Sequence, residues 1–289
     1  MIDEVISKAT TQDGYDKEAY IQKKREQLNW AYNTVEQSIE ELKNSPQFFN
    51  DYLNVQSRFD MYTPRNALLI AKQLPNAMQL KERKDWIDAK VSFKDKYPKK
   101  VIIIEPRESY INKDGKTITP YNAKELIDIS ETTTKPNIKS YDKKLILQGL
   151  LHESKSSNIP IKAVDDLENN KMCEWNQKDG AIYVKRTDNY DEVIKAVATE
   201  IAKINLYDKT EDIDNDKAEC IAYMVCKKYG IDVPNVNTEN IMNKYSNMEL
   251  NAVINDLTTM KEVTLDINTG MGQYLDDKRK EFKSKEQER

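Results

Sequence analysis

The residues best suited to chemistry in this sequence are cations and aromatic rings that alternate between positions 58 and 100. Proteins that bind single-stranded nucleic acid without sequence preference combine a basic groove for the phosphates with rings on which bases stack. The candidate cations are Arg58, Arg65, Lys72, Arg83, Lys84, Lys90, Lys94, Lys96, Lys99 and Lys100. The candidate rings are Tyr62, Trp86, Phe93 and Tyr97. The pattern predicts a surface for a single-stranded polyanion, with the lysines of 94–100 as its best phosphate contacts.

Three residues of this region have two interpretations. Trp86 is either a core residue or a stacking platform. Asn66 and Gln73 lie seven residues apart on one expected helix and share a face, so they either bond to backbone inside the fold or reach a ligand. We keep all three in the predicted site. Its residues are Tyr62, Arg65, Asn66, Lys72, Gln73, Trp86, Lys90, Lys94, Lys96, Lys99 and Lys100.

The net charge of −4 conceals a basic middle segment. Residues 58–124 carry 15 Lys/Arg and 8 Asp/Glu, and the flanks on both sides are acidic. A polyanion site needs such a segment, but charge alone fits a solvated mixed-charge surface as well. The nucleic-acid prediction therefore depends on the rings together with the cations.

Composition argues against several other classes of protein. There are only 7 glycines and no G-x-G-x-x-G or G-x-x-x-x-G-K-[ST] string, which disfavours a nucleotide-binding loop. No apolar run reaches the ~18–20 residues that span a bilayer, and the N-terminus lacks a signal-peptide pattern, so we expect a cytoplasmic protein with no membrane partner. Cys173, Cys220 and Cys226 are an odd number without a C-x-x-C, and we expect reduced, buried thiols.

Periodicity, caps and breakers predict an α+β protein. Expected helices cover 16–44, 47–59, 63–74, 85–89, 143–151, 191–206, 216–229, 238–246 and 248–261. Expected strands cover 101–104, 110–112, 117–119, 161–164, 172–175 and 181–184. From Gly270 the chain is dense in charge, so we expect a frayed helix or disorder there.

One stretch resembles the signature of ArdC-type antirestriction proteins and LtrC-like mobile-element proteins. It reads Tyr62-Thr63-Pro64-Arg65-Asn66-Ala67-Leu68-Leu69-Ile70-Ala71-Lys72-Gln73-Leu74-Pro75-Asn76-Ala77, against a family pattern of roughly Y-S-x-x-N-x-L-L-I-x-x-Q-x-P-x-A. A tryptophan, here Trp86, and a basic turn before an apolar strand ending in Pro106 follow in the family order. The resemblance covers about residues 20–125, although the family's glycines near the basic turn are replaced. It implies single-stranded DNA as a partner and carriage on a plasmid, conjugative element or phage.

In ArdC relatives the second domain resembles a small gluzincin-type peptidase with H-E-x-x-H on one helix and E-S-x-A-Y on the next. Here the frames fall on Thr199-Glu200-Ile201-Ala202-Lys203 and on Glu219-Cys220-Ile221-Ala222-Tyr223. The resemblance makes Glu219 the match to the third, acidic ligand. Catalytic zinc needs about three protein ligands and an open position. We therefore predict a pseudo-metallopeptidase without metal, cofactor or catalytic residues, its degenerate site being Thr199, Glu200, Lys203 and Glu219.

Lys203 supports a more specific hypothesis, in which its ammonium group replaces the charge of the metal. Glu200 and Lys203 are three residues apart on a helix and can pair, and Glu219 could join them. Two carboxylates without a cation would be costly if buried. The alternative is that Lys203 extends to solvent.

These observations predict an ArdC-like single-stranded-DNA-binding domain at 1–127, a linker at 128–140, a degenerate minigluzincin-like domain at 141–262 and a charged tail at 263–289. The predicted function is non-catalytic binding of single-stranded DNA in mobile-element biology, with antirestriction-like protection of incoming DNA. One alternative is a scaffold that offers the former peptidase cleft to a protein partner. Another is a residual hydrolase that uses Glu200.

Overall fold

The computed structural model describes residues 17–137, 140–156 and 158–287. Its α-helices are α2 (Lys17–Asn44), α3 (Pro46–Arg58), α4 (Pro64–Gln73), α5 (Arg83–Asp88), α6 (Lys143–Ser156), α7 (Tyr190–Thr210), α8 (Asn215–Lys228), α9 (Glu239–Ser246) and α10 (Leu250–Gln287). Its strands are β1 (Leu80–Lys81), β2 (Val101–Pro106), β3 (Tyr110–Ile111), β4 (Thr117–Ile118), β5 (Tyr121–Asp128), β6 (Ile161–Val164), β7 (Cys173–Asn176) and β8 (Ala181–Lys185). Two 3-10 turns are η1 (Ile129–Glu131) and η2 (Glu168–Asn170). None of the described helices is both long enough and apolar enough to cross a membrane.

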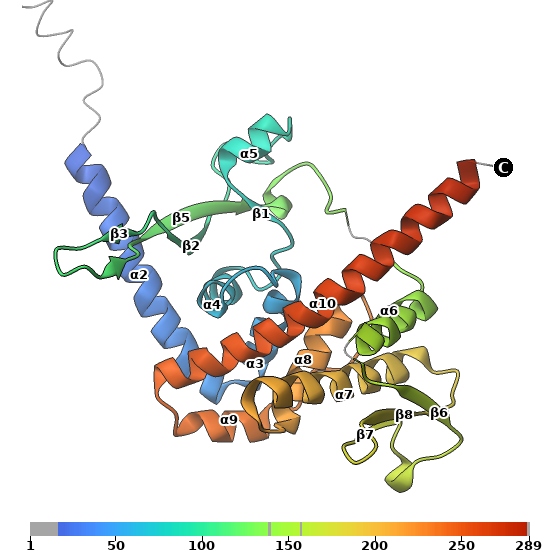
Figure 1. Cartoon of the computed structure of the whole chain (residues 1–289). Coiled ribbons are helices and arrows are strands. Elements are labelled where there is room, and N and C mark those ends of the chain that lie inside the picture. The colour runs from blue at the N-terminus through green and yellow to red at the C-terminus, as the bar shows by residue number, and fades with distance from the viewer. Residues whose placement is uncertain (1–16, 138–139, 157, 288–289) are drawn as a thin grey trace, which may run out of the picture.

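The first half consists of α2, α3 and α4 packed against a small sheet (Figure 1). The predicted apolar stripe of α2 is confirmed, because Ala31, Val35, Ile39 and Leu42 are buried. Serine and threonine caps begin the next two helices, as the sequence predicted for α4: Ser45 accepts from the backbone of Phe48, and Thr63 from that of Asn66. The fold class, α+β, is confirmed.

The sheet of the first half has the order β1-β5-β2, and both outer strands run antiparallel to β5. The strand predicted at 101–104 is confirmed within β2, but β5 was not predicted. The β5 sequence contains Ala, Lys, Glu and Leu, which favour helices. It forms a strand because β1 and β2 supply hydrogen-bond partners on its two edges.

Between β2 and β5 the chain forms a projecting hairpin, residues 107–121, which we call the hairpin arm (Figure 1). β3 and β4 pair in register Tyr110↔Ile118, as the Asp-Gly turn predicted. The tip is closed by the Asn112 side chain, which accepts from two backbone N–H groups, those of Asp114 and Lys116. Gly115 has φ +75°, which favours glycine at this position.

The second half places a three-stranded sheet against helices α6 and α7. The strand order is β6-β8-β7, with β6 parallel and β7 antiparallel to β8. α7 buries Val193, Ile194, Val197 and Ile201, and α8 packs beside it. Helix, three strands, helix and helix is the order that the sequence predicted. β7 is an edge strand, so one side of it is left open beside α7.

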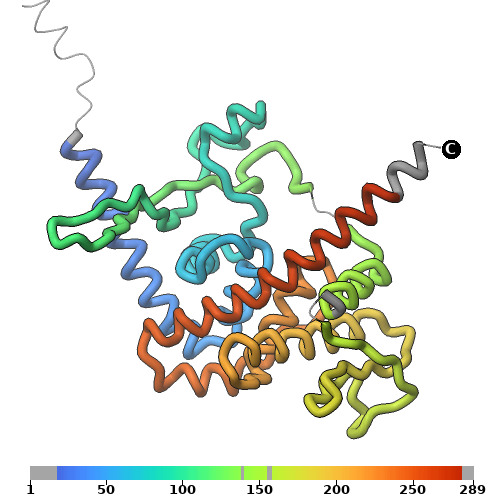
Figure 2. Tube along the Cα trace, viewed as in Figure 1, coloured from blue at the N-terminus to red at the C-terminus, as the bar shows by residue number. Residues whose placement is uncertain are grey.

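The segment predicted as a charged tail, 263–289, is helical in its described part, which is one of the two expected states, but it is packed rather than frayed as far as Leu275. α10 continues to Gln287 and buries Val263, Ile267, Met271 and Leu275, which are spaced at four-residue steps. α10 contacts α6, α7 and α8 and crosses the molecule diagonally in Figure 1. The start of α2 and the end of α10 lie on opposite sides of the molecule (Figure 2). The apolar stripe of α10 was not recognised in the sequence, because Asn268 and Gly270 interrupt it.

The expected linker at 128–140 is structured at its start. Asp128 is the last residue of β5 and is almost fully buried. Its carboxylate accepts from the backbone of Met78, Gln79 and Ser130 at 2.8–2.9 Å. These bonds hold β1, β5 and η1 together, so this end of the sheet is fixed rather than free.

Buried contacts join the two predicted domains. Asn50 of α3 exchanges two hydrogen bonds with the backbone of Val236, at 3.2 and 3.0 Å. The Tyr223 hydroxyl of α8 donates to Asn54 of α3 at 2.9 Å. Most of the buried apolar residues of both halves form one continuous core. The two halves therefore support each other.

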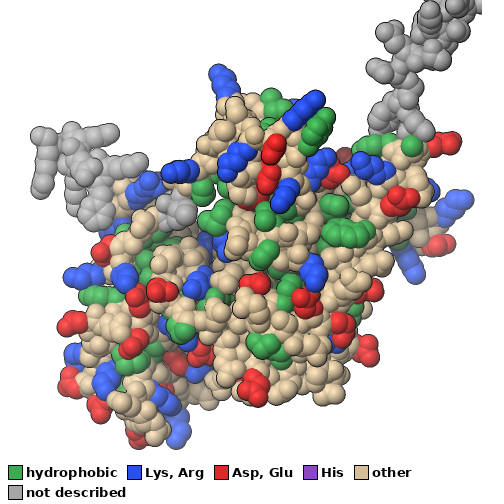
Figure 3. Space-filling view, turned by 180° about the vertical axis from the view of Figure 1, so that it is seen from behind, with side chains coloured by type: hydrophobic (Ala, Val, Ile, Leu, Met, Phe, Trp, Pro, Cys, Tyr) green, Lys and Arg blue, Asp and Glu red, His purple; other side chains and the backbone are tan. Residues whose placement is uncertain are grey.

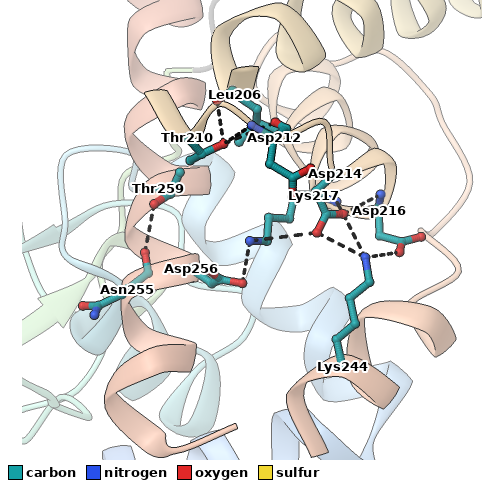
Figure 4. Close-up of polar contacts among 10 residues, drawn as sticks. All are labelled: Leu206, Thr210, Asp212, Asp214, Asp216, Lys217, Lys244, Asn255, Asp256 and Thr259. Carbon is teal, nitrogen blue, oxygen red and sulfur yellow. Dashed lines mark hydrogen bonds and ion pairs between the residues drawn. The ribbon is translucent and has the colours of Figure 1, made fainter. Parts of the chain in front are cut away.

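A network of aspartates and lysines fixes the N-terminus of α8 (Figure 4). Asp214 caps the helix, and the Lys244 ammonium lies 2.8 Å from Asp216 and 3.1 Å from Asp214. Lys217 bridges to Asp256 of α10 at 2.7 Å. The hydrogen bond to Asp216 is the largest factor that raises the pKa of Lys244. The network joins α8 to α9 and α10 and so positions the helix that carries Glu219.

Glu153 of α6 is expected to make stability depend on pH. Its carboxylate fills the space that a Cβ at Gly270 of α10 would occupy. Burial, and then Asp266, raises the pKa of Glu153 above its ordinary 4.5. Above pH 4.5 the native state therefore binds more protons than the unfolded state, and this contribution to stability falls as the pH rises through the folded pKa.

We expect Glu153→Gln to stabilise the protein at pH 7.5 and to have little effect at pH 4.5, as measured by urea unfolding. Glu36→Gln on the exposed surface of α2 is the control and should be neutral at both values. An equal effect of Glu153→Gln at the two pH values would contradict this prediction.

Candidate nucleic-acid interface and degenerate cleft

Asn66 and Gln73 bind the backbone of β2, so their assignment to the nucleic-acid site is wrong. The Asn66 amide donates to the carbonyl of Ile104 and accepts from its N–H, each at 2.8 Å. Gln73 makes the same pair of bonds with Ile102, at 2.8 and 2.9 Å. These two side chains take the place of a neighbouring strand along the outer edge of β2. The edge would otherwise have unpaired polar groups in the interior.

Trp86 is a core residue, so its predicted role as a stacking platform is also wrong. Its side chain is 2% exposed and packs with Ile127 and Ile129. The indole N–H donates to the carbonyl of Ile127 at 2.9 Å. Trp86 therefore fastens α5 to the end of β5, which leaves the rest of α5 exposed.

Four further candidates are engaged within the helical layer. Tyr62 stacks on Phe59, and burial raises the pKa of its hydroxyl. Lys72 pairs with a carboxylate of α2, and Arg65 faces α10. Arg58, which the sequence also suggested as a cation, donates to the carbonyls of residues 75 and 77, and burial lowers its pKa. None of the four belongs to the cationic surface described next.

The remaining cations form one exposed surface, the cationic lobe, which comprises residues 81–100. It holds eight Lys/Arg and four Asp/Glu. Figure 3 shows Lys and Arg side chains gathered over the projection that contains α5, with apolar side chains between them. The exposed cations of the lobe are Arg83, Lys84, Lys90, Lys94, Lys96, Lys99 and Lys100. The lysines of 94–100, predicted as phosphate contacts, are all exposed in this segment, whereas Arg65 and Lys72 lie outside it.

The cations of the lobe differ from those of the second half in their pairing. Within the described ranges, Lys100 pairs with Glu125, but Arg83, Lys84, Lys90, Lys94, Lys96 and Lys99 form no ion pair with a carboxylate. Beyond residue 140, most cations of the described chain are paired, although Lys144, Lys162, Lys178, Lys227, Lys261 and Arg279 form no ion pair with a carboxylate there. The paired cations are Lys143, Lys171, Lys185, Arg186, Lys195, Lys203, Lys209, Lys217, Lys228, Lys244, Lys278 and Lys280. The positive potential of the lobe is thus left uncancelled by direct partners.

Backbone contacts hold the loop of the lobe against η1. The backbone N–H of Lys94 donates to the carbonyl of Glu131, and its ammonium to that of Ser130 at 2.7 Å. The N–H of Lys99 donates to the carboxylate of Glu131 at 3.0 Å. These bonds restrain the loop, so the ammonium groups of Lys96 and Lys99 project from a fixed backbone.

The exposed rings lie in places that the sequence did not all indicate. Of the predicted rings, Tyr97 is 81% exposed and lies 5.2 Å from the Lys96 ammonium. Phe93 is partly buried beneath the Arg83 guanidinium, with Trp86. Two further exposed rings, Tyr110 and Tyr121, lie on the hairpin arm, which was not assigned to the site. The predicted hairpin itself was the available signal, since residues near a projecting turn stay outside the core.

The degenerate peptidase frame lies beside the edge strand β7. Thr199, Glu200 and Lys203 are on α7, and Glu219 is on α8. The Glu200 carboxylate accepts from the backbone N–H of Trp175 at 2.9 Å and pairs with the Lys203 ammonium at 2.7 Å. The side chains of Glu200 and Lys203 are 10% and 22% exposed. The ammonium group therefore supplies the positive charge next to a largely buried carboxylate.

Glu219 does not join this pair. Its carboxylate lies 3.0 Å from the ammonium of Lys195, which is about two turns before Lys203 on α7. The Thr199 hydroxyl donates to the carbonyl of Lys195 at 2.9 Å and so completes an intrahelical bond. The expectation that Glu219 would share Lys203 is wrong, because Lys195 is available to it on the facing side of the helix.

The side chains of this cleft do not fit a metal ion. The described part of the chain contains no group of three or more His, Cys, Asp or Glu residues placed to hold one. Cys173 lines the cleft, but burial strongly raises the pKa of its thiol, which opposes the thiolate form that metals bind. His152 lies on α6 and contacts the ring of Tyr274.

The cleft between β7, α7 and α8 has a volume of about 860 Å³. Its lining carries three ion pairs: Lys171–Glu174, Lys195–Glu219 and Lys203–Glu200. With Lys178 and Glu192, which also line it, the cleft has four lysines and four glutamates, so the charges cancel. The cleft therefore lacks the excess positive charge of the lobe.

No protein-family model matches the sequence, and no curated protein matches it. Among solved structures, the chain is similar to the metal-free crystal structure of the antirestriction protein ArdC from plasmid R388. The TM-score is 0.51 at 10% identity, over 73% of this chain and 86% of that one. A Mn(II)-bound structure of the same protein gives a TM-score of 0.46 at 10% identity, over 76% and 97%. The first of these similarities, together with the signature in α4, shows that this chain has an ArdC-like fold.

Proposed function

We propose that this protein binds single-stranded DNA through the cationic lobe, without catalysis, and acts in antirestriction on a plasmid or related mobile element. The observation that carries the proposal is the set of six lobe cations that lack carboxylate partners, beside the exposed ring of Tyr97. Most of the described cations beyond residue 140 pair with carboxylates, whereas these six do not. The likeness to ArdC of plasmid R388, described as an antirestriction protein, supports the biological setting.

The physical basis of the proposal is the release of counterions from DNA. Each phosphate contact lowers the slope of log K against log salt by about 0.7 for single strands. Six contacts from the lobe would give a slope of about −4. We expect a fluorescent oligo(dT) to bind tightly at 50 mM salt and weakly at 300 mM, as followed by fluorescence anisotropy. Absence of binding by micromolar protein at 50 mM salt would contradict the proposal.

Lys90, a cation of the lobe, has a strained backbone conformation. It has φ 58° and follows the last turn of α5, where its N–H donates to Ile87 and that of Val91 donates to Trp86. This is the position at which helices most often place glycine, because a side chain there costs about 1–2 kcal/mol. A cation kept in a strained position beside other unpaired cations is a candidate functional residue.

We expect Lys90→Gly to stabilise the protein by about 1 kcal/mol and at the same time to weaken DNA binding. The loss of one phosphate contact predicts a decrease of roughly eightfold at 50 mM salt. Urea unfolding and anisotropy measure the two effects. The matched control is Glu211→Gly, which relieves the same conformation (φ 58°) at the end of α7 and should leave binding unchanged. Unaltered DNA binding by Lys90→Gly would remove Lys90 from the site.

The non-catalytic part of the proposal rests on the cleft. Lys203 stands where the peptidase frame needs a ligand, and its ammonium is already paired with Glu200. We expect no hydrolysis of casein or of fluorogenic peptides, with or without added Zn²⁺ or Mn²⁺. Turnover that is abolished by Glu200→Gln would instead favour a residual hydrolase.

A further inference from the structure

We infer that the hairpin arm is a second element of the single-strand site and that Tyr110 and Tyr121 stack on bases. Tyr110 is 56% exposed and Tyr121 is 45% exposed, and Ile111 between them and the tip is 73% exposed. Stacking on bases requires rings that solvent can reach, which Trp86 and Phe93 do not offer. This inference rests on the proposed function, because it adds two exposed rings to Tyr97 of the cationic lobe.

The arm and the lobe are joined through one ladder of backbone hydrogen bonds. Lys100, at the end of the lobe, directly precedes β2, and Arg107, at the start of the arm, directly follows it. β2 pairs with β5 along its whole length, and the Arg107 N–H adds a bond to the carbonyl of Pro120. Six residues of strand span about 20 Å. The two elements are therefore held at a fixed separation that one extended strand of nucleic acid can bridge.

Cations accompany the exposed rings of the arm. Arg107, Lys113 and Lys116 are exposed, and in the described ranges none forms an ion pair with a carboxylate. Glu108 and Asp114 also lie on the arm, so its net charge is only +1. Rings that alternate with cations suit a chain of bases and phosphates.

The geometry also sets the chemical class of the ligand. A ring can stack only on a base whose face is open, and in a duplex the base faces are covered by their neighbours. The lysines of the lobe contact phosphates, which both single strands and duplexes carry. The two rings of the arm should therefore strengthen the preference for single strands that Tyr97 begins, while the lysines of the lobe supply affinity for either form.

The test compares the full-length double variant Tyr110→Ala/Tyr121→Ala with the wild type, using a fluorescent 30-residue oligo(dT) and a duplex of the same length. Stacking on one base corresponds to about fivefold to 150-fold in Kd. We expect the variant to bind the single strand at least tenfold more weakly, with an unchanged salt slope and unchanged duplex affinity. The double variant Tyr110→Phe/Tyr121→Phe keeps both rings and should bind like the wild type. Tyr207→Ala removes a ring of similar exposure on α7 and is the control.

Each other outcome has a defined meaning. If the alanine variant binds the single strand within twofold of the wild type while Lys→Gln variants of the lobe are weakened, the arm is excluded and the proposed function stands. If the alanine variant loses affinity equally for single strand and duplex, stacking by the arm is excluded. If the wild type binds neither oligonucleotide, both the arm and the proposed function are overturned. The urea midpoint of each variant verifies that the exposed substitutions leave the fold intact.

Discussion

Replacing Lys84, Lys90, Lys96 and Lys99 together with glutamine should weaken the binding of single-stranded DNA by about 10³-fold at 50 mM salt. All four side chains are exposed and have no carboxylate partner in the described structure. Four lost phosphate contacts should make the slope of log K against log salt less negative by about 3. Anisotropy titrations of oligo(dT) between 50 and 300 mM salt measure both quantities.

A matched control removes the same charge from elsewhere on the protein. Lys143, Lys171, Lys185 and Lys209 each pair with a carboxylate at the surface of the second half. Replacing these four with glutamine lowers the net charge equally but removes no lobe cation. Single-strand affinity should then fall by less than about threefold, because salt screens the attraction between DNA and charges that lie far from the lobe. Equal losses in the two quadruple variants would mean that net charge, and not the lobe, determines binding.

Lys203→Met should lower the free energy of unfolding by about 3 kcal/mol, because it leaves the Glu200 carboxylate largely buried without its cation. The Glu200 side chain is 10% exposed, and only the Trp175 N–H would remain to stabilise its charge. This follows from the role assigned to Lys203, in which the ammonium group takes the place of a metal's charge. The double variant Glu200→Gln/Lys203→Met removes both charges, keeps an acceptor for Trp175, and should recover most of the loss.

Lys195→Met provides the comparison within the same cleft. Its partner Glu219 is 45% exposed, so water can solvate the carboxylate that is left, and the cost should stay below about 1 kcal/mol. Urea unfolding midpoints of the four proteins give the differences. If Lys203→Met is no more destabilising than Lys195→Met, then Lys203 is an ordinary surface lysine and the replacement of the metal's charge is excluded.

The sequence predicted that Asn66 and Gln73 share one face of a helix but left the role of that face open. The sequence predicted that both amides lie on one face of α4, and this is confirmed, because both contact β2. Their partners, Ile104 and Ile102, are 38 and 29 residues away in the chain. No local pattern contains that information, so only the tertiary structure could distinguish a backbone clamp from a ligand contact.

β5 and the end of α10 were missed for opposite reasons. The residues of β5 favour a helix locally, and pairing with β1 and β2 overrides that preference. The end of α10 carries a valid apolar stripe, but its many charges and Gly270 resemble those of a frayed tail. The partner that uses the stripe is α6, which lies over a hundred residues earlier. Both errors concern segments whose state is set by distant neighbours.

The sequence by itself determined the features that depend on residues within a few positions: caps, helix periodicity and the Asp-Gly turn. The tertiary structure alone decided which rings are exposed and which cations are paired. Trp86 and Tyr97 are eleven residues apart in the same basic segment, yet one lies in the core against Ile127 and the other in solvent. Burial and ion pairing depend on which distant elements meet, and that is settled only when the sheet and helices pack.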